Sequence, residues 1–361
     1  MKNAMNPLKV LVVDDSLLMQ RVLTDILQSD PQLSVVGTAR NGEEALARIP
    51  AVHPDVVTLD VEMPVMNGLE ATRVIMSTNP VPIVIVTASR NAQETKMTMD
   101  ALAAGALTLI EKPKGMIATS GNQSITEMVT IVRLMAGVKV VTRMIMPVIK
   151  ESVRVEAEIC KGDFITPHGI SIIAIGVSTG GPPVLKEIFS QLGRDFPVPI
   201  IVVQHIAAGF IKGMVDWLAG ILSIRVKTGC DGERLQGGTI YFAPDGQHLI
   251  IDKAGIIRLK EKLNDNICPS VARLFGSVLT SFGRQTLAIM LTGMGDDGAR
   301  EMKLLHDAGA TTIAQHQESA LIFGMPGEAV KMKGVTCLLR TNEIAGLLNK
   351  IEFDHKKSEI N

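Results

Sequence analysis

Short apolar runs that alternate with helix-like segments constrain the fold of this chain more than any other feature. In the first third, helical patterns over Leu17–Leu27 and Gly42–Ile49 lie among five strand-like runs: Lys9–Val13, Leu33–Ala39, Val56–Leu59, Pro82–Thr87 and Ala106–Ile110. Strands separated by helices predict a parallel sheet with right-handed crossovers. We therefore expect an α/β domain with a doubly wound, five-stranded parallel sheet.

The same alternation restarts in the second half of the chain. Helical patterns cover Pro183–Leu192 and Ala299–Ala308, and the strand-like runs are Ile170–Ile175, Pro199–Val203, Ala288–Leu291 and Thr311–Ala314. We expect Thr239–Ala243 and His248–Asp252 to pair as an antiparallel hairpin around the turn Pro244–Gly246. The second half is therefore predicted to be a Rossmann-like, doubly wound α/β domain with a mostly parallel sheet and a β-hairpin.

Length and composition set the number of domains and exclude some partners. At roughly 150 residues per domain, 361 residues predict two domains. We place them at residues 7–124 and 166–354, joined by a linker at 125–165 that begins as a helix over Ile125–Val141. The chain has 36 basic and 37 acidic residues and 3% aromatic residues, so we expect no nucleic-acid binding. No apolar stretch reaches the ~18 residues that span a bilayer. We therefore expect no membrane insertion and a cytoplasmic protein.

Polar residues suited to phosphoryl transfer follow the apolar runs of the first half. Asp14 and Asp15 end the first run and Asp60 ends the third, so neighbouring strands would bring three carboxylates to one edge of the sheet. Such groups repel each other unless a cation lies among them, and oxygen ligands with an open position suit Mg2+. Thr87 and Lys112, which follow the next two runs, add a hydroxyl and an ammonium. Each residue alone is more often a cap or turn residue, but five of them at strand ends favour a site.

These residues carry a resemblance to the receiver domain of bacterial two-component response regulators. The similar stretches, between about residues 8 and 120, are V-L-V-V-D-D-S, V-V-T-L-D-V-E-M-P-V-M-N-G, V-T-A-S and A-A-G-A-L-T-L-I-E-K-P. The resemblance implies a flavodoxin-like fold in which Asp60 is the phospho-acceptor. It also implies that Asp14, Asp15, Asp60 and the backbone carbonyl of Glu62 hold Mg2+.

Three further positions complete the comparison with receivers. The resemblance implies that Thr87 and Lys112 contact the phosphoryl group. Leu109 departs from the pattern, because receivers commonly place an aromatic residue there.

A strand-to-helix turn in the second half has the pattern of a nucleophile elbow. The strand Ile170–Ile175 runs into G-V-S-T-G-G and then into a helix, and small residues at this turn would raise the Ser178 hydroxyl above the sheet. The N-terminus of the helix supplies N–H groups for an oxyanion. Glycine-rich turns of this kind also bind phosphate, but this turn has neither a Lys nor a G-x-x-x-x-G-K pattern.

A serine nucleophile needs a base and a carboxylate that orients the base. His205 comes directly after a strand that ends in V-V-Q, at the same kind of strand end as Ser178. A lone His after a strand is otherwise more often a hydrogen-bonded core residue. Asp296 and Asp297 follow a further strand in a glycine-rich loop, and the residues alone do not choose between them. The pattern predicts a serine acyl hydrolase.

These segments resemble the catalytic domain of chemotaxis protein-glutamate methylesterases, the CheB family. The similar stretches are A-I-G-V-S-T-G-G-P, V-V-Q-H-I, F-A-P-D-G-Q-H-L, L-T-G-M-G-D-D-G-A and F-G-M-P-G-E-A, and with the receiver and the linker they span nearly the whole chain. The resemblance implies a Ser178–His205–Asp297 triad with oxyanion donors among the main-chain N–H groups near Thr179 and Met294. It implies no cofactor at the hydrolase site.

The resemblance also implies a function and partners. The substrates would be glutamate methyl esters, and specific glutamines, on the cytoplasmic domains of methyl-accepting chemoreceptors, and a chemotaxis histidine kinase would be the phosphodonor. Phosphorylation at Asp60 would activate the hydrolase by moving a receiver that packs over the Ser178 cleft. The alternative is a phosphorylation-dependent scaffold with a degenerate hydrolase domain. Ala272 and His316, which replace the Asp of the family's usual H-x-P-S-V-D and Q-D-E, favour the scaffold, whereas the intact triad disfavours it.

Overall fold

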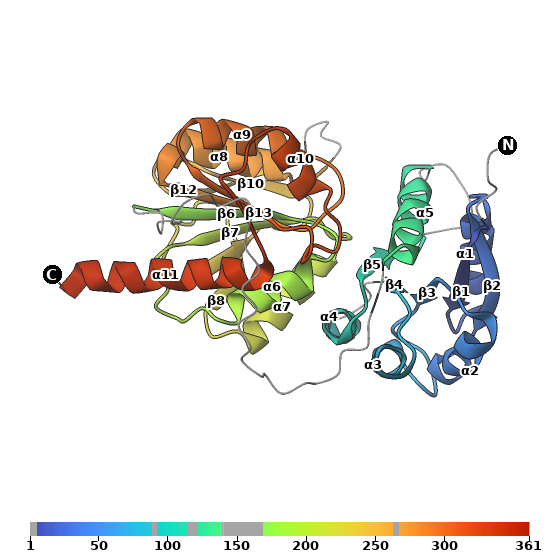
Figure 1. Ribbon diagram of the computed structural model, residues 1–361. Helices are drawn as coiled ribbons and strands as arrows, with labels where there is room; N and C mark the ends of the chain where they lie inside the picture. Colours follow the sequence, from blue (N-terminus) through green and yellow to red (C-terminus); the bar gives the residue numbers. More distant parts are fainter. Residues whose placement is uncertain are drawn as a thin grey trace. The chain divides into compact units, whose positions relative to one another are not determined.

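The computed structural model contains two compact units, Met1–Ser152 and Val153–Asn361, which we describe separately. The structure describes residues 6–88, 92–113, 122–138, 140, 169–262 and 267–360 (Figure 1). Both units are α/β and contain a sheet whose strands run parallel, as the sequence predicts.

Five parallel strands form the sheet of the first unit in the order β2-β1-β3-β4-β5. The strands are β1 (Leu8–Val13), β2 (Leu33–Ala39), β3 (Val56–Leu59), β4 (Ile83–Thr87) and β5 (Thr108–Glu111). Every residue of β3 and β4 is buried. Strands that are covered on both faces read as continuous apolar runs, which is why the sequence predicted this sheet correctly.

The helices of the first unit form two layers (Figure 1). Helix α1 contacts α5, while α3 contacts both α2 and α4. Their bounds are α1 (Leu17–Gln28), α2 (Gly42–Val52), α3 (Gly68–Thr78), α4 (Ala92–Ala104) and α5 (Asn122–Ala136). Side chains cap several of these helices; at α3, Asn67 and Glu70 form a reciprocal capping box.

Helix α5 places part of the predicted linker in the fold of the first unit. It covers Asn122–Ala136, whereas the sequence predicted a helix over Ile125–Val141. It contacts α1, β3 and β4, and its buried side chains are Met128, Val129, Ile131, Val132 and Met135. An apolar stripe at helical spacing therefore packs against the sheet. The exact domain limits stay predictions, and most of the predicted linker lies outside the described residues.

Seven strands form the main sheet of the second unit in the order β14-β13-β12-β6-β7-β9-β8, and every described pairing is parallel. The strands are β6 (Ile172–Val177), β7 (Ile200–Gln204), β8 (Arg225–Thr228), β9 (Thr239–Phe242), β12 (Thr286–Met290), β13 (Thr311–Gln315) and β14 (Cys337–Leu339). The strands β6, β7 and β12 lie at the centre and are completely buried.

The second unit contains a β-hairpin, but the predicted pairing of Thr239–Ala243 with His248–Asp252 is wrong. Strand β9 does not pair with the strand that follows it; it joins the main sheet in parallel with β7 and β8. The antiparallel hairpin consists instead of β10 (Gln247–Ile251) and β11 (Ile257–Glu261). The turn between these two strands is closed by Asp252, whose Oδ1 accepts the N–H groups of Ala254 and Ile256, and by Gly255 at φ +71°. Because all four residues of β9 are buried, this strand fits the covered parallel sheet.

Helices cover both faces of the main sheet (Figure 1). Helix α8 contacts α9, which in turn contacts α10, while α11 contacts α6. The bounds are α6 (Gly181–Phe189), α7 (Phe210–Ile221), α8 (Val271–Phe282), α9 (Ala299–Asp307), α10 (Met325–Lys331) and α11 (Thr341–Ile360), with a short 3-10 turn at Gly283–Gln285. This arrangement leaves the loops after the strands as the place where polar side chains can gather.

Candidate functional site

Ser178 lies in the turn between β6 and α6. Its N–H donates to the Thr292 carbonyl at 2.9 Å, and its own carbonyl accepts from the Gly181 N–H at 2.9 Å. Gly180 has φ +82°, a left-handed conformation that favours glycine, and it leads directly into α6. The side chain of Ser178 is only partly buried. The sequence therefore folds into the expected strand–turn–helix arrangement, with the serine at the end of the strand.

His205 lies beside Ser178 because their strands pair in register. In the β6–β7 ladder Val177 is opposite Gln204, so Ser178 and His205 leave adjacent strands at the same level. The His205 N–H donates to the Val177 carbonyl at 2.9 Å. The buried Gln204 side chain joins the two turns, since its Nε2 donates to the carbonyls of both Ser178 and His205 at 2.8 Å each.

Asp297 comes from the loop after β12, the strand on the other side of β6. Its Oδ2 lies 3.0 Å from His205 Nε2, whereas Asp296 is exposed. Burial alone would raise the pKa of Asp297, but the close contact and charge of His205 and the backbone N–H groups of Val271 and Ala272 outweigh burial and lower this pKa. Of the two aspartates that the residues left open, Asp297 is the one paired with the imidazole.

The loop that carries Met294 approaches the serine closely because it contains Gly293. A Cβ atom on Gly293 would lie 2.6 Å from Ser178 Cβ, a distance that no side chain tolerates. Thr292 ties this loop to the serine turn, since its Oγ1 donates to the Thr179 carbonyl at 2.9 Å. Among the hydrogen bonds of the described residues, none uses the N–H of Thr179 or of Met294.

Two departures from the family pattern lie next to this site and leave its contacts in place. Ala272 contributes its backbone N–H, which donates to Asp297 Oδ1 at 3.1 Å whatever the side chain. His316 follows β13, where its N–H donates to the Leu339 carbonyl and its Nδ1 accepts from the Glu318 N–H. The sequence did not single out Gln204 or Thr292, since glutamine and threonine at strand ends have no chemical signature of their own.

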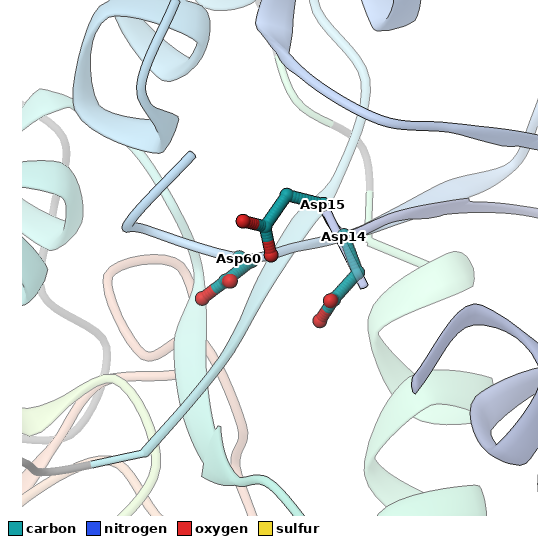
Figure 2. Close-up of side chains that lie close together, drawn as sticks. All are labelled: Asp14, Asp15 and Asp60. Carbon is teal, nitrogen blue, oxygen red and sulfur yellow. The ribbon is translucent and has the colours of Figure 1, made fainter. Parts of the chain in front are cut away.

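Three carboxylates meet at the edge of the first sheet, as predicted (Figure 2). Val13 and Leu59 are partners in the β1–β3 ladder, so Asp14 and Asp60 follow these strands at the same level. Oxygens of Asp14, Asp15 and Asp60 all lie within 4.8 Å of one another. Asp14 and Asp60 are buried and Asp15 is exposed. An all-oxygen set that is open on one side fits Mg2+.

Lys112 joins the two buried carboxylates. Its Nζ lies 2.7 Å from Asp60 Oδ2 and 2.8 Å from Asp14 Oδ2, and the Val61 N–H donates to Asp60 Oδ1 at 2.8 Å. Burial raises the pKa of Asp60 to about 6 against the opposing effect of Lys112, and the charge of Asp14 adds to the rise. Burial lowers the pKa of Lys112, but the two carboxylates outweigh burial, so this pKa lies above its usual value.

The other predicted receiver residues lie on the strands and the turn that neighbour the carboxylates. Thr87 ends β4, where its buried hydroxyl donates to Glu94 Oε1 in α4 at 2.7 Å, a contact that spacing does not predict. Glu62 follows the Asp60 turn with an exposed side chain. Leu109 is buried in β5 opposite Ile85. The structure therefore places Thr87 on the strand next to Asp60, with its hydroxyl engaged elsewhere.

Known families match each of the two units, and known relatives match nearly the whole chain. The family described as CheB methylesterase matches residues 173–348, and the response regulator receiver domain matches residues 10–118. A protein-glutamate methylesterase/protein-glutamine glutaminase of Geobacter metallireducens is 43% identical over 348 residues, 96% of this chain and 99% of the relative. One of Syntrophus aciditrophicus is 42% identical over 350 residues, 95% and 98% of the two chains. The solved catalytic domain of Thermotoga maritima CheB methylesterase is 33% identical, covers 51% of this chain and 98% of that chain, and has a TM-score of 0.48.

The two units thus define a response regulator that combines a receiver domain with a methylesterase domain. Helices long and apolar enough to cross a membrane are absent from the described part of the chain. From its similarity to curated relatives over nearly its full length, the chain belongs to the CheB family of protein-glutamate methylesterases/protein-glutamine glutaminases.

The raised pKa of Asp60 predicts a pH-dependent stability of the first unit. In folded protein Asp60 keeps its proton up to about pH 6, whereas an unfolded Asp loses it near pH 4. In Mg2+-free buffer the free energy of unfolding should therefore fall as the pH rises from about 4 to about 6, by no more than about 3 kcal/mol from this group. Urea unfolding of wild type and Asp60→Asn at several pH values measures the difference. Parallel pH curves for the two proteins would contradict the prediction.

Proposed function

We propose that this chain is a phosphorylation-activated protein-glutamate methylesterase and protein-glutamine glutaminase in bacterial chemotaxis. The observation that carries the proposal is the placement of Ser178 and His205 at one level of adjacent strands, with Asp297 3.0 Å from the imidazole. The names of relatives at about 40% identity give the same activity, and that activity does not favour the scaffold alternative. The substrates are methyl esters and specific glutamines on the cytoplasmic domains of methyl-accepting chemoreceptors.

The residues of the second unit support an acyl-enzyme cycle. Ser178 Oγ attacks the ester carbonyl while His205 takes its proton; because Nε2 faces Asp297, Nδ1 is the ring nitrogen left to accept it. The N–H groups of Thr179 and Met294 stabilise the oxyanion. The proton then passes from His205 to the leaving methanol, and a water activated by the same imidazole releases glutamate and free Ser178. A glutamine side chain follows the same steps and loses ammonia. No cofactor takes part.

In the first unit, Asp60 accepts a phosphoryl group from a chemotaxis-type histidine kinase. The carboxylates of Asp14, Asp15 and Asp60 and the backbone carbonyl of Glu62 would hold Mg2+, which supplies positive charge next to the incoming phosphoryl oxygens. The kinase and the receptor domains lie in the cytoplasm, which is where we place this protein.

Two side chains recognise the phosphoryl group on Asp60. The Lys112 ammonium, which already contacts both buried carboxylates, pairs with a phosphoryl oxygen. Thr87 ends the neighbouring strand, and its hydroxyl leaves Glu94 and donates to another phosphoryl oxygen. The resulting change in the receiver relieves inhibition of the hydrolase, for which a few kcal/mol of difference between two states is enough.

Replacing the nucleophile tests the hydrolase. Ser178→Ala should lower methanol release from a methylated receptor fragment by at least about a thousandfold, because the acyl-enzyme cannot form. The matched control is Ser190→Ala, an exposed serine at the end of α6, which should keep wild-type release. Equal methanol release from Ser178→Ala and wild type would show that Ser178 is not the nucleophile.

Replacing the phospho-acceptor tests activation. Acetyl phosphate with Mg2+ should increase methanol release severalfold in the wild type but not in Asp60→Asn, whose amide cannot form the acyl phosphate. Asp25→Asn, an exposed position of α1, should respond as the wild type does. Stimulation of the Asp60 variant by acetyl phosphate would show that the phosphoryl group acts elsewhere.

A further inference from the structure

We propose that Ser270 is a positioning residue of the hydrolase that acts on substrate only through Asp297. The inference rests on the proposed function and extends it to a residue outside the Ser178–His205–Asp297 triad. Ser270 precedes Asp297 by 27 residues and is the N-cap of α8, the helix that packs against β6 and β12. Its side chain is buried, so water does not compete strongly for its hydrogen bonds.

The beginning of α8 holds the Asp297 carboxylate from one side. Ser270 Oγ donates to Oδ1 at 2.9 Å, the Ala272 N–H donates to the same oxygen at 3.1 Å, and the Val271 N–H donates to Oδ2 at 2.7 Å. On the other side, Oδ2 faces His205 Nε2 at 3.0 Å. The three donors therefore fix both oxygens of the carboxylate in the orientation that faces the imidazole.

The electrostatics of this contact favour an ionised Asp297. A helix N-terminus carries positive potential and unpaired N–H groups, and both stabilise an anion. The first turn of α8 has no acidic side chain, so no carboxylate of that turn competes with Asp297 for these donors. Of the three donors at the beginning of α8, Ser270 supplies the one that comes from a side chain, and a substitution can remove it.

Capping of α8 is the competing explanation for Ser270. Its Oγ also accepts from the Arg273 N–H at 3.3 Å, the usual contact of an N-cap. A hydroxyl can accept one hydrogen bond and donate another, so both roles are met at once. The substitution Ser270→Asp distinguishes capping from positioning. Aspartate caps a helix about as well as serine, but it cannot donate a hydrogen bond and it brings a second negative charge to Asp297.

The test compares Ser270→Ala, Ser270→Asp and Ser270→Thr in the full chain, activated with acetyl phosphate and Mg2+. Methanol release from a methylated receptor fragment gives kcat and kcat/KM as a function of pH. The midpoint of thermal unfolding measures the stability that the cap of α8 contributes. Ser281→Ala is the matched control, since this serine lies in the last turn of the same helix and donates to the Ile251 carbonyl at 2.9 Å.

We expect Ser270→Ala to lower kcat about tenfold, as the loss of a hydrogen bond to a charged group does. Ser270→Asp should lose at least as much although it keeps a capping side chain on α8. In both variants the acid limb of the kcat/KM profile should move to higher pH. The coupled Asp297–His205 pair loses stabilisation of its negative charge, so the pair keeps its proton up to a higher pH. Ser270→Thr should retain most of the activity, and Ser281→Ala should keep the wild-type pH profile.

Each contrary result identifies what has failed. Wild-type kcat and pH profile in Ser270→Asp, with hydrolysis that still depends on Ser178, would overturn the inference alone and leave Ser270 as a cap. Hydrolysis that persists in Ser178→Ala would overturn the proposed function and this inference with it.

Discussion

Parallel pairing of β6 with its two neighbours, β7 and β12, is the constraint on which the hydrolase site depends. The register that sets Val177 opposite Gln204 and Gly176 opposite Met290 brings three loops to one edge of the sheet. Because side chains alternate across a strand, a shift of one residue would turn the site residues to the other face. Gln204 reinforces the register from β7, since one amide group binds the backbone of both turns.

The two units stabilise, in different ways, a carboxylate in the loop after a strand. In the first unit an ammonium does so, yet the pKa of Asp60 is still raised, because the burial of Asp60 and the charge of Asp14 outweigh Lys112. In the second unit a helix N-terminus and an imidazole hold Asp297, and its pKa is lowered. In the proposed mechanism Asp60 is consumed as the phospho-acceptor, whereas Asp297 stays charged throughout the cycle.

Much of this could be predicted from the sequence, because the strands that matter are buried on both faces and read as apolar runs. A residue directly after such a run lies at the sheet edge, which placed Ser178, His205, Asp14 and Asp60 without any knowledge of the turns. Short strands beside a tight turn were harder: β9 and β10 flank Pro244–Gly246, but β9 is completely buried and pairs within the main sheet.

The spacing of residues in the sequence could not predict contacts between distant segments. The choice of Asp297 over Asp296 depends on the direction in which a glycine-rich loop turns, and the contact of Ser270 with Asp297 joins positions 27 residues apart. An N-cap serine before an apolar helix is visible in a sequence. What that cap binds beyond its own helix is not.

The hydroxyl of Thr87 has a single proton, and here it is given to Glu94. In the proposed mechanism a phosphoryl oxygen would accept this same hydrogen bond, so Thr87 could bind the phosphate only by giving up its contact with the first turn of α4. The free energy of the Thr87–Glu94 hydrogen bond would then be subtracted from the free energy that the phosphoryl contact supplies.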